Sequence, residues 1–141
     1  MSEPLTGGCL CGAVRYVVDA AVDRLVACYC TDCRRMTGAG GSVSAVAPAR
    51  AFRLTRGQTR VFTTTADSGN PLHRHFCGDC GSGVYNPMGG DPDRIVLKAG
   101  TLDRHDGLRI TLNVWAASRP PWAPIDTAAA THERQYVPGS R

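Results

Sequence analysis

The chain has 141 residues, of which 43% are hydrophobic, and a formal net charge of +4 at pH 7. This length is most simply that of one domain, and we expect residues 1–141 to form a single unit. No apolar run approaches the roughly 18–20 residues that a membrane span needs, so we expect no membrane partner. The first residues lack the basic flank and apolar stretch of a signal peptide, which favours the reducing cytoplasm as the location.

Arginine supplies almost all of the positive charge. Of the 16 basic residues only Lys98 is a lysine. The arginine fork suits carboxylates and phosphates, although a biased genome composition also explains such an excess. Because the arginines are scattered and are not interleaved with aromatic residues, we expect no nucleic-acid partner.

The first pair of cysteines lies near the start of the chain, in Gly7-Gly8-Cys9-Leu10-Cys11-Gly12. In a straight strand, residues two apart are separated by roughly 6.5–7 Å. Two sulfur atoms on one zinc ion, each about 2.3 Å from the metal, must lie closer than that. The flanking glycines permit the necessary bend, and residues 13–18 then have the β-branched and aromatic enrichment of a strand.

The next cysteines lie in Cys28-Tyr29-Cys30-Thr31-Asp32-Cys33-Arg34-Arg35, which packs three thiols into six residues. We expect a strand over 25–27 to deliver Cys28, and a short helical turn to begin at Thr31 or Asp32, which are good N-caps. The glycines within 38–41 end this turn. Three thiols so close, with no fourth ligand in the same stretch, describe a zinc site with an open position.

The rest of the chain consists of short strand candidates separated by turns that contain glycine, proline or aspartate, one of them over 91–93. The candidates are residues 42–46, 52–54, 60–65, 72–76, 95–98 and 109–115. The absence of any long amphipathic helix, repeat or linker predicts a mainly β domain. Residues 127–141 show little periodicity and are predicted to form a loosely packed tail.

The last two cysteines follow the strand candidate 72–76, in Phe76-Cys77-Gly78-Asp79-Cys80-Gly81. With the first pair they make four thiols, which is enough for one closed tetrahedral zinc site. The seven cysteines therefore divide into four for a structural zinc and three for a second zinc. Disulfides would leave one cysteine over, and a redox dithiol at Cys77 and Cys80 lacks the βαβ pattern that usually surrounds one.

With these residues in view, the chain resembles the glutathione-dependent formaldehyde-activating enzyme family, which also includes centromere protein V-like proteins. Five ordered motifs across nearly the whole chain carry the resemblance. They are Gly8-Cys9-x-Cys11-Gly12, Cys28-x-Cys30-x-x-Cys33-Arg34-Arg35, Arg74-x-Phe76-Cys77-x-x-Cys80-Gly81-Ser82, Gly100-Thr101-Leu102-Asp103 and Ser118-Arg119-Pro120-Pro121-Trp122.

The resemblance implies a β-tent fold of short antiparallel sheets stapled by zinc. It implies a structural zinc on Cys9, Cys11, Cys77 and Cys80, and a second zinc on Cys28, Cys30 and Cys33. The implied activity is that of a carbon–sulfur lyase that forms or cleaves S-hydroxymethylglutathione. The chain departs from the family at Tyr29, where members usually carry a histidine.

The residue chemistry at the second site supports a thiol substrate. Zinc with three thiolates has a formal charge of −1, which favours binding an incoming thiol as thiolate over activating water. We expect Arg34 and Arg35 to offset this charge or to bind a substrate carboxylate. Such a three-ligand site is expected to be only partly occupied in purified protein. The sequence does not name the proton donor, for which Tyr29, Asp32 and His75 are candidates by sequence proximity alone.

Two other classes of function stay open at this point. One is a non-catalytic, zinc-stabilised module that binds protein or nucleic acid. Such a module would complete four protein ligands at the second site, with His75 as the nearest spare donor. The other is a thiol or zinc redox sensor that uses residues 28–33, which would form a reversible disulfide on losing metal.

Overall fold

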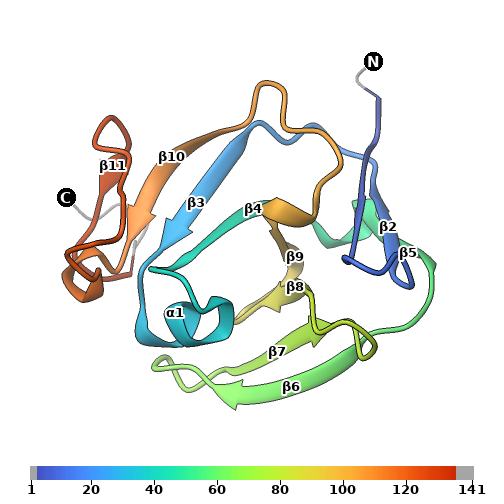
Figure 1. Cartoon of the computed structure of the whole chain (residues 1–141), viewed down its shortest axis with the longest axis horizontal. Helices are drawn as coiled ribbons and strands as arrows, with labels where there is room; N and C mark the ends of the chain where they lie inside the picture. The colour runs from blue at the N-terminus through green and yellow to red at the C-terminus, as the bar shows by residue number, and fades with distance from the viewer. Residues whose placement is uncertain (1–2, 136–141) are drawn as a thin grey trace.

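The computed structural model describes residues 3–135, and these consist mainly of β-strands, as predicted (Figure 1). The strands are Leu5–Gly8 (β1), Arg15–Val18 (β2), Arg24–Cys28 (β3), Ser42–Pro48 (β4), Phe52–Arg56 (β5), Arg60–Thr65 (β6), Pro71–Phe76 (β7), Gly83–Met88 (β8), Asp91–Lys98 (β9), Arg109–Val114 (β10) and Ala130–Thr131 (β11). The α-helix is Thr31–Thr37 (α1), and short 3-10 segments cover Ala49–Ala51 (η1), Ala99–Thr101 (η2) and Ala116–Ser118 (η3).

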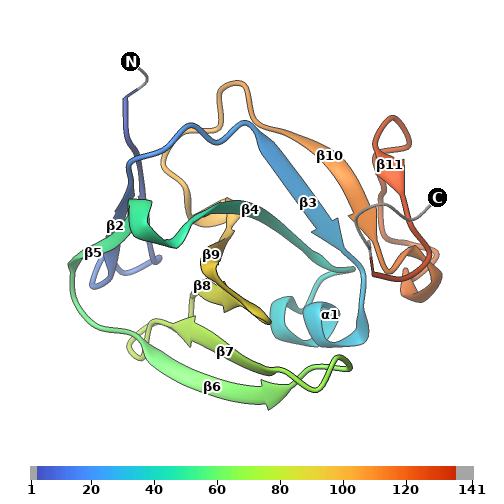
Figure 2. The same cartoon turned by 180° about the vertical axis from the view of Figure 1, so that it is seen from behind.

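The strands form two sheets. The small sheet has the order β1-β2-β5, and the large one has the order β11-β10-β3-β4-β9-β8-β7-β6. Figures 1 and 2 show α1 at the end of β3, facing the hairpin of β6 and β7. The large sheet therefore contains β3 and β4, the two strands that flank α1 in sequence.

Several local details differ from the sequence-based expectations. β10 pairs in parallel with β3 and with β11, whereas the resemblance implied antiparallel sheets. The turn expected over 91–93 lies instead at Gly89 and Gly90, because Gly90 adopts the left-handed φ of 80° that the reversal needs. Residues 91–93 already belong to β9. The N-cap of α1 is Cys30 rather than Thr31 or Asp32.

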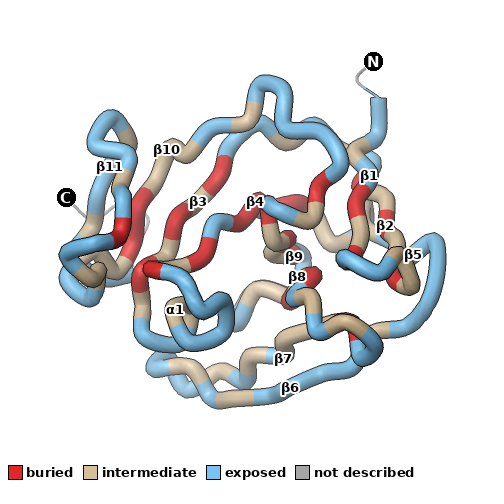
Figure 3. The backbone as a smooth tube through the Cα atoms, in the orientation of Figure 1, coloured by how far each residue is buried: buried red, intermediate tan, exposed pale blue. Residues whose placement is uncertain are grey.

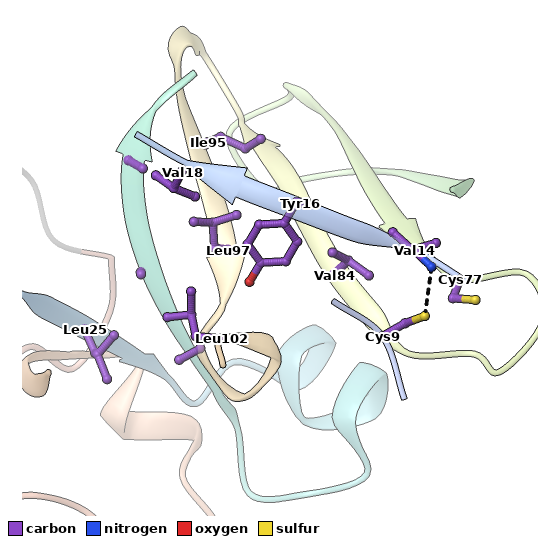
Figure 4. Packing of buried hydrophobic residues seen from close by; sticks show 13 residues of the cluster. Cys9, Val14, Tyr16, Val18, Leu25, Cys77, Val84, Ile95, Leu97 and Leu102 are labelled. Carbon is purple, nitrogen blue, oxygen red and sulfur yellow. Dashed lines mark hydrogen bonds between the residues drawn. The ribbon is translucent and has the colours of Figure 1, made fainter. Parts of the chain in front are cut away.

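The main core lies between the two sheets (Figure 4). Its large, fully buried side chains include Val14, Tyr16, Val18, Val84 and Leu97. They alternate with more exposed residues along β2 and β9, which is the period of two that a sheet with one buried face requires. Figure 3 shows that buried residues follow β2, β3, β4, β8 and β9, whereas the edge strand β6 is largely exposed.

A row of rings joins the two sheets through this core. Tyr16 of β2 contacts Phe52 of β5 at a centroid distance of 5.4 Å, and Phe52 contacts Tyr85 of β8 at 4.5 Å. Tyr85 stacks on His75 of β7 at 4.2 Å. Ring pairs at such distances are attractive beyond the area they bury. The row fixes the small sheet, whose first strand leads into Cys9, against β7 and β8, which flank Cys77 and Cys80.

Part of the predicted tail is packed against the large sheet. β11 pairs with β10, and the amide of Trp115 donates to the carbonyl of Arg134. Residues 136–141 lie outside the described residues, and the assignment of 127–141 as a loosely packed tail stays a prediction.

Candidate metal centres

The structure brings Cys9, Cys11, Cys77 and Cys80 together from two distant parts of the chain. Cys9 follows β1, and Cys77 follows β7. The Sγ atoms of Cys9 and Cys11 are 3.7 Å apart, as are those of Cys11 and Cys77, and none of these cysteines forms a disulfide. A tetrahedral zinc with bonds of about 2.3 Å requires neighbouring sulfurs roughly 3.8 Å apart. This donor set therefore fits one zinc ion.

Two similar turns place these four sulfurs. The amide of Gly12 donates to the carbonyl of Cys9 at 3.2 Å, and the amide of Gly81 donates to the carbonyl of Cys77 at 2.8 Å. Both glycines have φ of 80°, a left-handed conformation that other residues rarely adopt. The expected bend after Cys9 is thus present, and it has a counterpart after Cys77.

Hydrogen bonds fix the sulfurs of Cys9 and Cys80 and join the two turns to each other. The amide of Val14 donates to Sγ of Cys9 at 3.2 Å, as the dashed line in Figure 4 shows. Oγ of Ser82 lies 3.2 Å from Sγ of Cys80 and accepts the amide of Leu10 at 3.1 Å. The Ser82 hydroxyl lowers the pKa of Cys80 to about 5. The hydroxyl therefore favours the thiolate form of Cys80, which is the form that a metal binds.

The second group comprises Cys28, Cys30 and Cys33, whose Sγ atoms all lie within 4.8 Å of one another. Cys28 ends β3, Cys30 caps α1, and Cys33 lies in the first turn of α1. Sγ of Cys30 accepts the amide of Cys33 at 3.3 Å, so one sulfur both caps the helix and faces the other two. All three side chains are half-buried, as a site open to a small molecule requires.

Among residues 3–135, no further His, Cys, Asp or Glu joins this second group. His75, the spare donor considered above, instead places Nδ1 2.8 Å from Oγ1 of Thr59 and stacks on Tyr85. Asp32 points toward Nη2 of Arg74, at 3.7 Å. The described residues therefore offer three ligands here against four in the first group, which is the division expected from the sequence.

The three thiols strongly influence one another. The thiols of Cys28 and Cys30, followed by the hydroxyl of Ser42 and the charge of Lys98, lower the pKa of Cys33 to about 2. Cys30 and Cys33, followed by burial, raise the pKa of Cys28. Such splitting is what neighbouring groups that share a negative charge show. A bound cation would remove the competition, because it favours all three thiolates together.

Lys98, which interacts with the charge of these sulfurs, was not singled out from the sequence as a site residue. Burial lowers the pKa of Lys98, which lies at the end of β9, and the charged cysteines raise it. The like charge of Arg74 on β7 lowers the pKa of Lys98. By contrast, Arg34 and Arg35 lie in the last turn of α1, and Arg35 is exposed. Neither has an ion pair within residues 3–135. The only feature of the sequence that distinguishes Lys98 is that it is the sole lysine of the chain.

Tyr29 lies away from the sulfurs between which it stands in sequence. Its ring is 6% exposed and packs with Ala27 and Ala123 in a second, smaller core cluster. Its hydroxyl donates to the carbonyl oxygen of Pro124 at 2.9 Å. This agrees with the alternation expected between neighbours in an extended segment.

Two surface cavities of about 430 and 400 Å³ lie elsewhere, and no cysteine lines either of them. The first of them is lined by residues that include Arg24, Gly107 and Arg109. Neither cavity shares a residue with the cysteine groups.

The comparisons with known proteins agree with this geometry. The sequence pattern of the family described as glutathione-dependent formaldehyde-activating enzyme matches residues 4–118. The chain belongs to this family. The matched segment contains all seven cysteines and both groups that the fold assembles.

A curated relative and a solved structure extend the comparison. A protein of Halomonas elongata, provisionally named a glutathione-dependent formaldehyde-activating enzyme, is 33% identical over 85 residues, which are 57% of this chain. The match spans about half, 54%, of that relative's length. A crystal structure of a Rhodobacter sphaeroides protein has a TM-score of 0.55 and 26% identity. That likeness covers 70% of this chain and 87% of the other.

No helix among residues 3–135 combines the length and the apolar character needed to cross a bilayer.

Proposed function

We propose that this protein is a zinc-dependent carbon–sulfur lyase that forms or cleaves S-hydroxymethylglutathione or a related thiol adduct. The observation that carries the proposal is the unequal pair of cysteine groups, with four sulfurs in one and three in the other. The family's name supports glutathione and formaldehyde as the substrate class. Seven free thiols fit a reducing compartment, for which we propose the cytoplasm.

In this proposal the first group has a structural role. Cys9, Cys11, Cys77 and Cys80 would hold a zinc ion that ties the start of the chain to the β7–β8 turn. A closed tetrahedral site contributes its binding free energy to folding. Its hydrogen bonds from Val14 and Ser82 orient the sulfurs in the way that the surroundings of a metal orient its ligands.

The second group has the catalytic role. Cys28, Cys30 and Cys33 would hold a zinc ion with one position free. When bound, this ion would supply a positive centre at which an incoming thiol loses its proton and binds as thiolate. The chain's own contribution is to keep three sulfurs on one side, with α1 fixed by its Cys30 cap.

The bonds that change are those of the substrates. In the synthetic direction, the sulfur of glutathione bonds to the carbon of formaldehyde, the C=O electron pair moves to oxygen, and that oxygen takes up a proton. In the reverse direction, the hydroxymethyl oxygen gives up its proton, the C–S bond breaks with its electron pair on sulfur, formaldehyde leaves, and the thiolate takes up a proton when it is released. Arg34 and Arg35 remain our candidates for binding a glutathione carboxylate, because arginine pairs with carboxylates bidentately.

The test is the exchange rate between glutathione and its hydroxymethyl adduct, measured by NMR exchange spectroscopy with and without zinc-loaded protein. We expect the wild-type protein to accelerate exchange and the Cys30→Ser variant to return it to the uncatalysed rate. S-methylglutathione, which lacks a free thiol, should not inhibit strongly. Equal rates with wild type and variant would contradict the proposal and would favour a non-catalytic zinc module.

A further inference from the structure

Lys98, the single lysine of the chain, is half-buried and has no carboxylate partner within residues 3–135. It is the last residue of β9, in the centre of the large sheet between β4 and β8. Within residues 3–135, the structure records no hydrogen bond or ion pair for its ammonium group. Withdrawing a charge from water without a partner is costly, so a nearby negative group would stabilise the charged form of Lys98.

The strand register places Lys98 on the same face of the sheet as the second cysteine group. Ser44 of β4 lies opposite Lys98, and Ser42 of the same strand lies opposite Cys28. Side chains two residues apart on a strand point to the same face, as do directly opposed residues on neighbouring strands. Both serines are buried, at 6% exposure. Cys28, the two serines and Lys98 therefore share one face.

The charged groups around Lys98 agree with this placement. Burial lowers the pKa of Lys98, the charge of Cys33 raises it, and Arg74 lowers it again. Cys28 and Cys30 act in the same direction as Cys33. Arg74 is already engaged, since it donates to Oγ1 of Thr64 and faces Asp32. Within the described residues, no carboxylate pairs with Lys98, whose charge interacts with all three cysteines.

On the function proposed above, the second site needs such a cation. Three thiolates and a zinc ion have a formal charge of −1, and a fourth thiolate from the substrate makes it −2. We propose that Lys98 balances the charge of the second site, and that it thereby allows the substrate thiol to bind there as thiolate. The sequence had assigned this charge offset to Arg34 and Arg35, which lie farther along α1 and have no ion pair among residues 3–135.

The experiment measures thiolate binding rather than turnover. Protein carrying cobalt(II) in place of zinc is titrated with glutathione, and sulfur-to-cobalt charge-transfer absorption reports each new thiolate. The variant is Lys98→Met, which keeps the side-chain length and removes the charge. Lys98→Arg is the conservative variant. Arg94→Met is the matched control, because Arg94 lies on the same strand but is exposed and pairs with Asp91.

We expect Lys98→Met to weaken glutathione binding by about tenfold at pH 7, since opposite charges near a protein surface interact this strongly. The pH at which half of the glutathione is bound should rise by about one unit, because a less favoured thiolate needs a higher pH to form. Lys98→Arg should restore most of the affinity, and Arg94→Met should match the wild type. If Lys98→Met lowers the melting temperature, Lys98→Gln replaces it in the same comparison.

Two distinct outcomes separate this proposal from the function on which it rests. If Lys98→Met binds glutathione with wild-type affinity and midpoint pH, Lys98 does not balance the site and this proposal is wrong, whereas the lyase proposal stands. If glutathione adds no charge-transfer absorption to the wild-type protein, or S-methylglutathione adds as much, then the substrate sulfur does not bind the metal. The proposed function then fails together with the role of Lys98.

Discussion

Neighbouring residues in the segment 28–33 lie in different surroundings. Cys30 caps α1 with its sulfur and shares its face with Cys28 and Cys33, whereas Tyr29 between them fills a separate apolar cluster. The hydroxyl of Tyr29 is satisfied by the carbonyl of Pro124. A position that lies between two ligands in sequence therefore belongs to the core in space.

This arrangement predicts the behaviour of Tyr29→Phe. The variant keeps the ring but loses the hydrogen bond to Pro124, which should lower the free energy of unfolding by about 1 kcal/mol. The zinc content should remain that of the wild type, because the phenol does not face the sulfurs. Metal analysis together with urea unfolding tests both statements. Loss of the second zinc would mean that Tyr29 completes the site, and the argument for an open position would be wrong.

The ion pair of Arg15 and Asp103 holds the segment 100–103 against the small sheet. Arg15 of β2 forms an ion pair with Asp103, and Thr6 of β1 donates to the same carboxylate at 2.6 Å. Arg15, followed by Thr6, lowers the pKa of Asp103 to about 2. In the unfolded chain the pKa of this carboxyl should be about 3.9. The pair therefore stabilises the fold above about pH 4 and loses its effect as the pH falls towards about 2.

We therefore expect Asp103→Asn to be less stable than the wild type at pH 7, by under about 1 kcal/mol because both side chains are partly exposed. The difference should shrink steadily below about pH 4. Unfolding curves of the two proteins across this range provide the comparison, since acid release of zinc acts on both. A difference that persists unchanged at pH 3 would show that Asp103 acts through something other than its charge.

At the scale of elements, the row of rings from Tyr16 to His75 connects the sheets that bring the first cysteine group together. Phe52 is central to it, because it contacts Tyr16 on one side and Tyr85 on the other. Its loss would separate the small sheet from β8 without touching a cysteine. The row therefore offers a way to disturb assembly of the first site from outside it.

Phe52→Ala should lower the free energy of unfolding by about 3 kcal/mol, which is typical for removing a ring from a core. Phe52→Leu, which keeps most of the volume, should cost less than about 1.5 kcal/mol. Phe62→Ala is the control, because Phe62 of β6 is 52% exposed and its loss should fall within about 0.5 kcal/mol. Denaturant unfolding of the three variants tests the ranking. Equal effects of Phe52→Ala and Phe62→Ala would contradict the role of the row.

Local patterns were enough to predict some elements. The flanking turns predicted a strand over residues 60–65, which the structure forms as β6. β1 was missed, because two of its four residues are glycine and it depends on pairing with β2 and on the amide of Asp103. The parallel pairing of β10 with β3 joins residues more than 80 positions apart, and no local pattern records such a contact.

The same limit applies to the sites. Cysteine spacing and flanking glycines predicted both groups, because ligands must be close and their turns must bend. Lys98 could not be placed from sequence, because its position depends on the register of β4 with β9 and with β3. Arg74 likewise reaches α1 only because the hairpin of β6 and β7 lies across from it.

At the scale of the whole molecule, the two cysteine groups should differ in what they stabilise. The first joins β1 and the β7–β8 turn, which are far apart in sequence, whereas the second lies within six consecutive residues. A cross-link between distant segments restricts the unfolded chain far more than a local one. The first group should therefore dominate the thermal stability.

Cys77→Ser should lower the melting temperature strongly, by well over 10 °C, because a structural zinc site contributes many kcal/mol to folding. Cys30→Ser should have a small effect, since serine keeps the N-cap of α1 while weakening the second metal site. Thermal melts of both variants, with added zinc, make the comparison. Equally large losses would show that the second group is structural as well.

The most direct test of the central claim is the number of sulfur atoms around zinc, measured by X-ray absorption on protein with both sites loaded. One site with four sulfurs and one with three average to roughly 3.5 sulfurs per zinc. Adding glutathione should raise this average to about 4, whereas S-methylglutathione should leave it unchanged. An average that is already about 4 without glutathione, or that does not change when glutathione is added, would contradict the open position and the lyase function built on it.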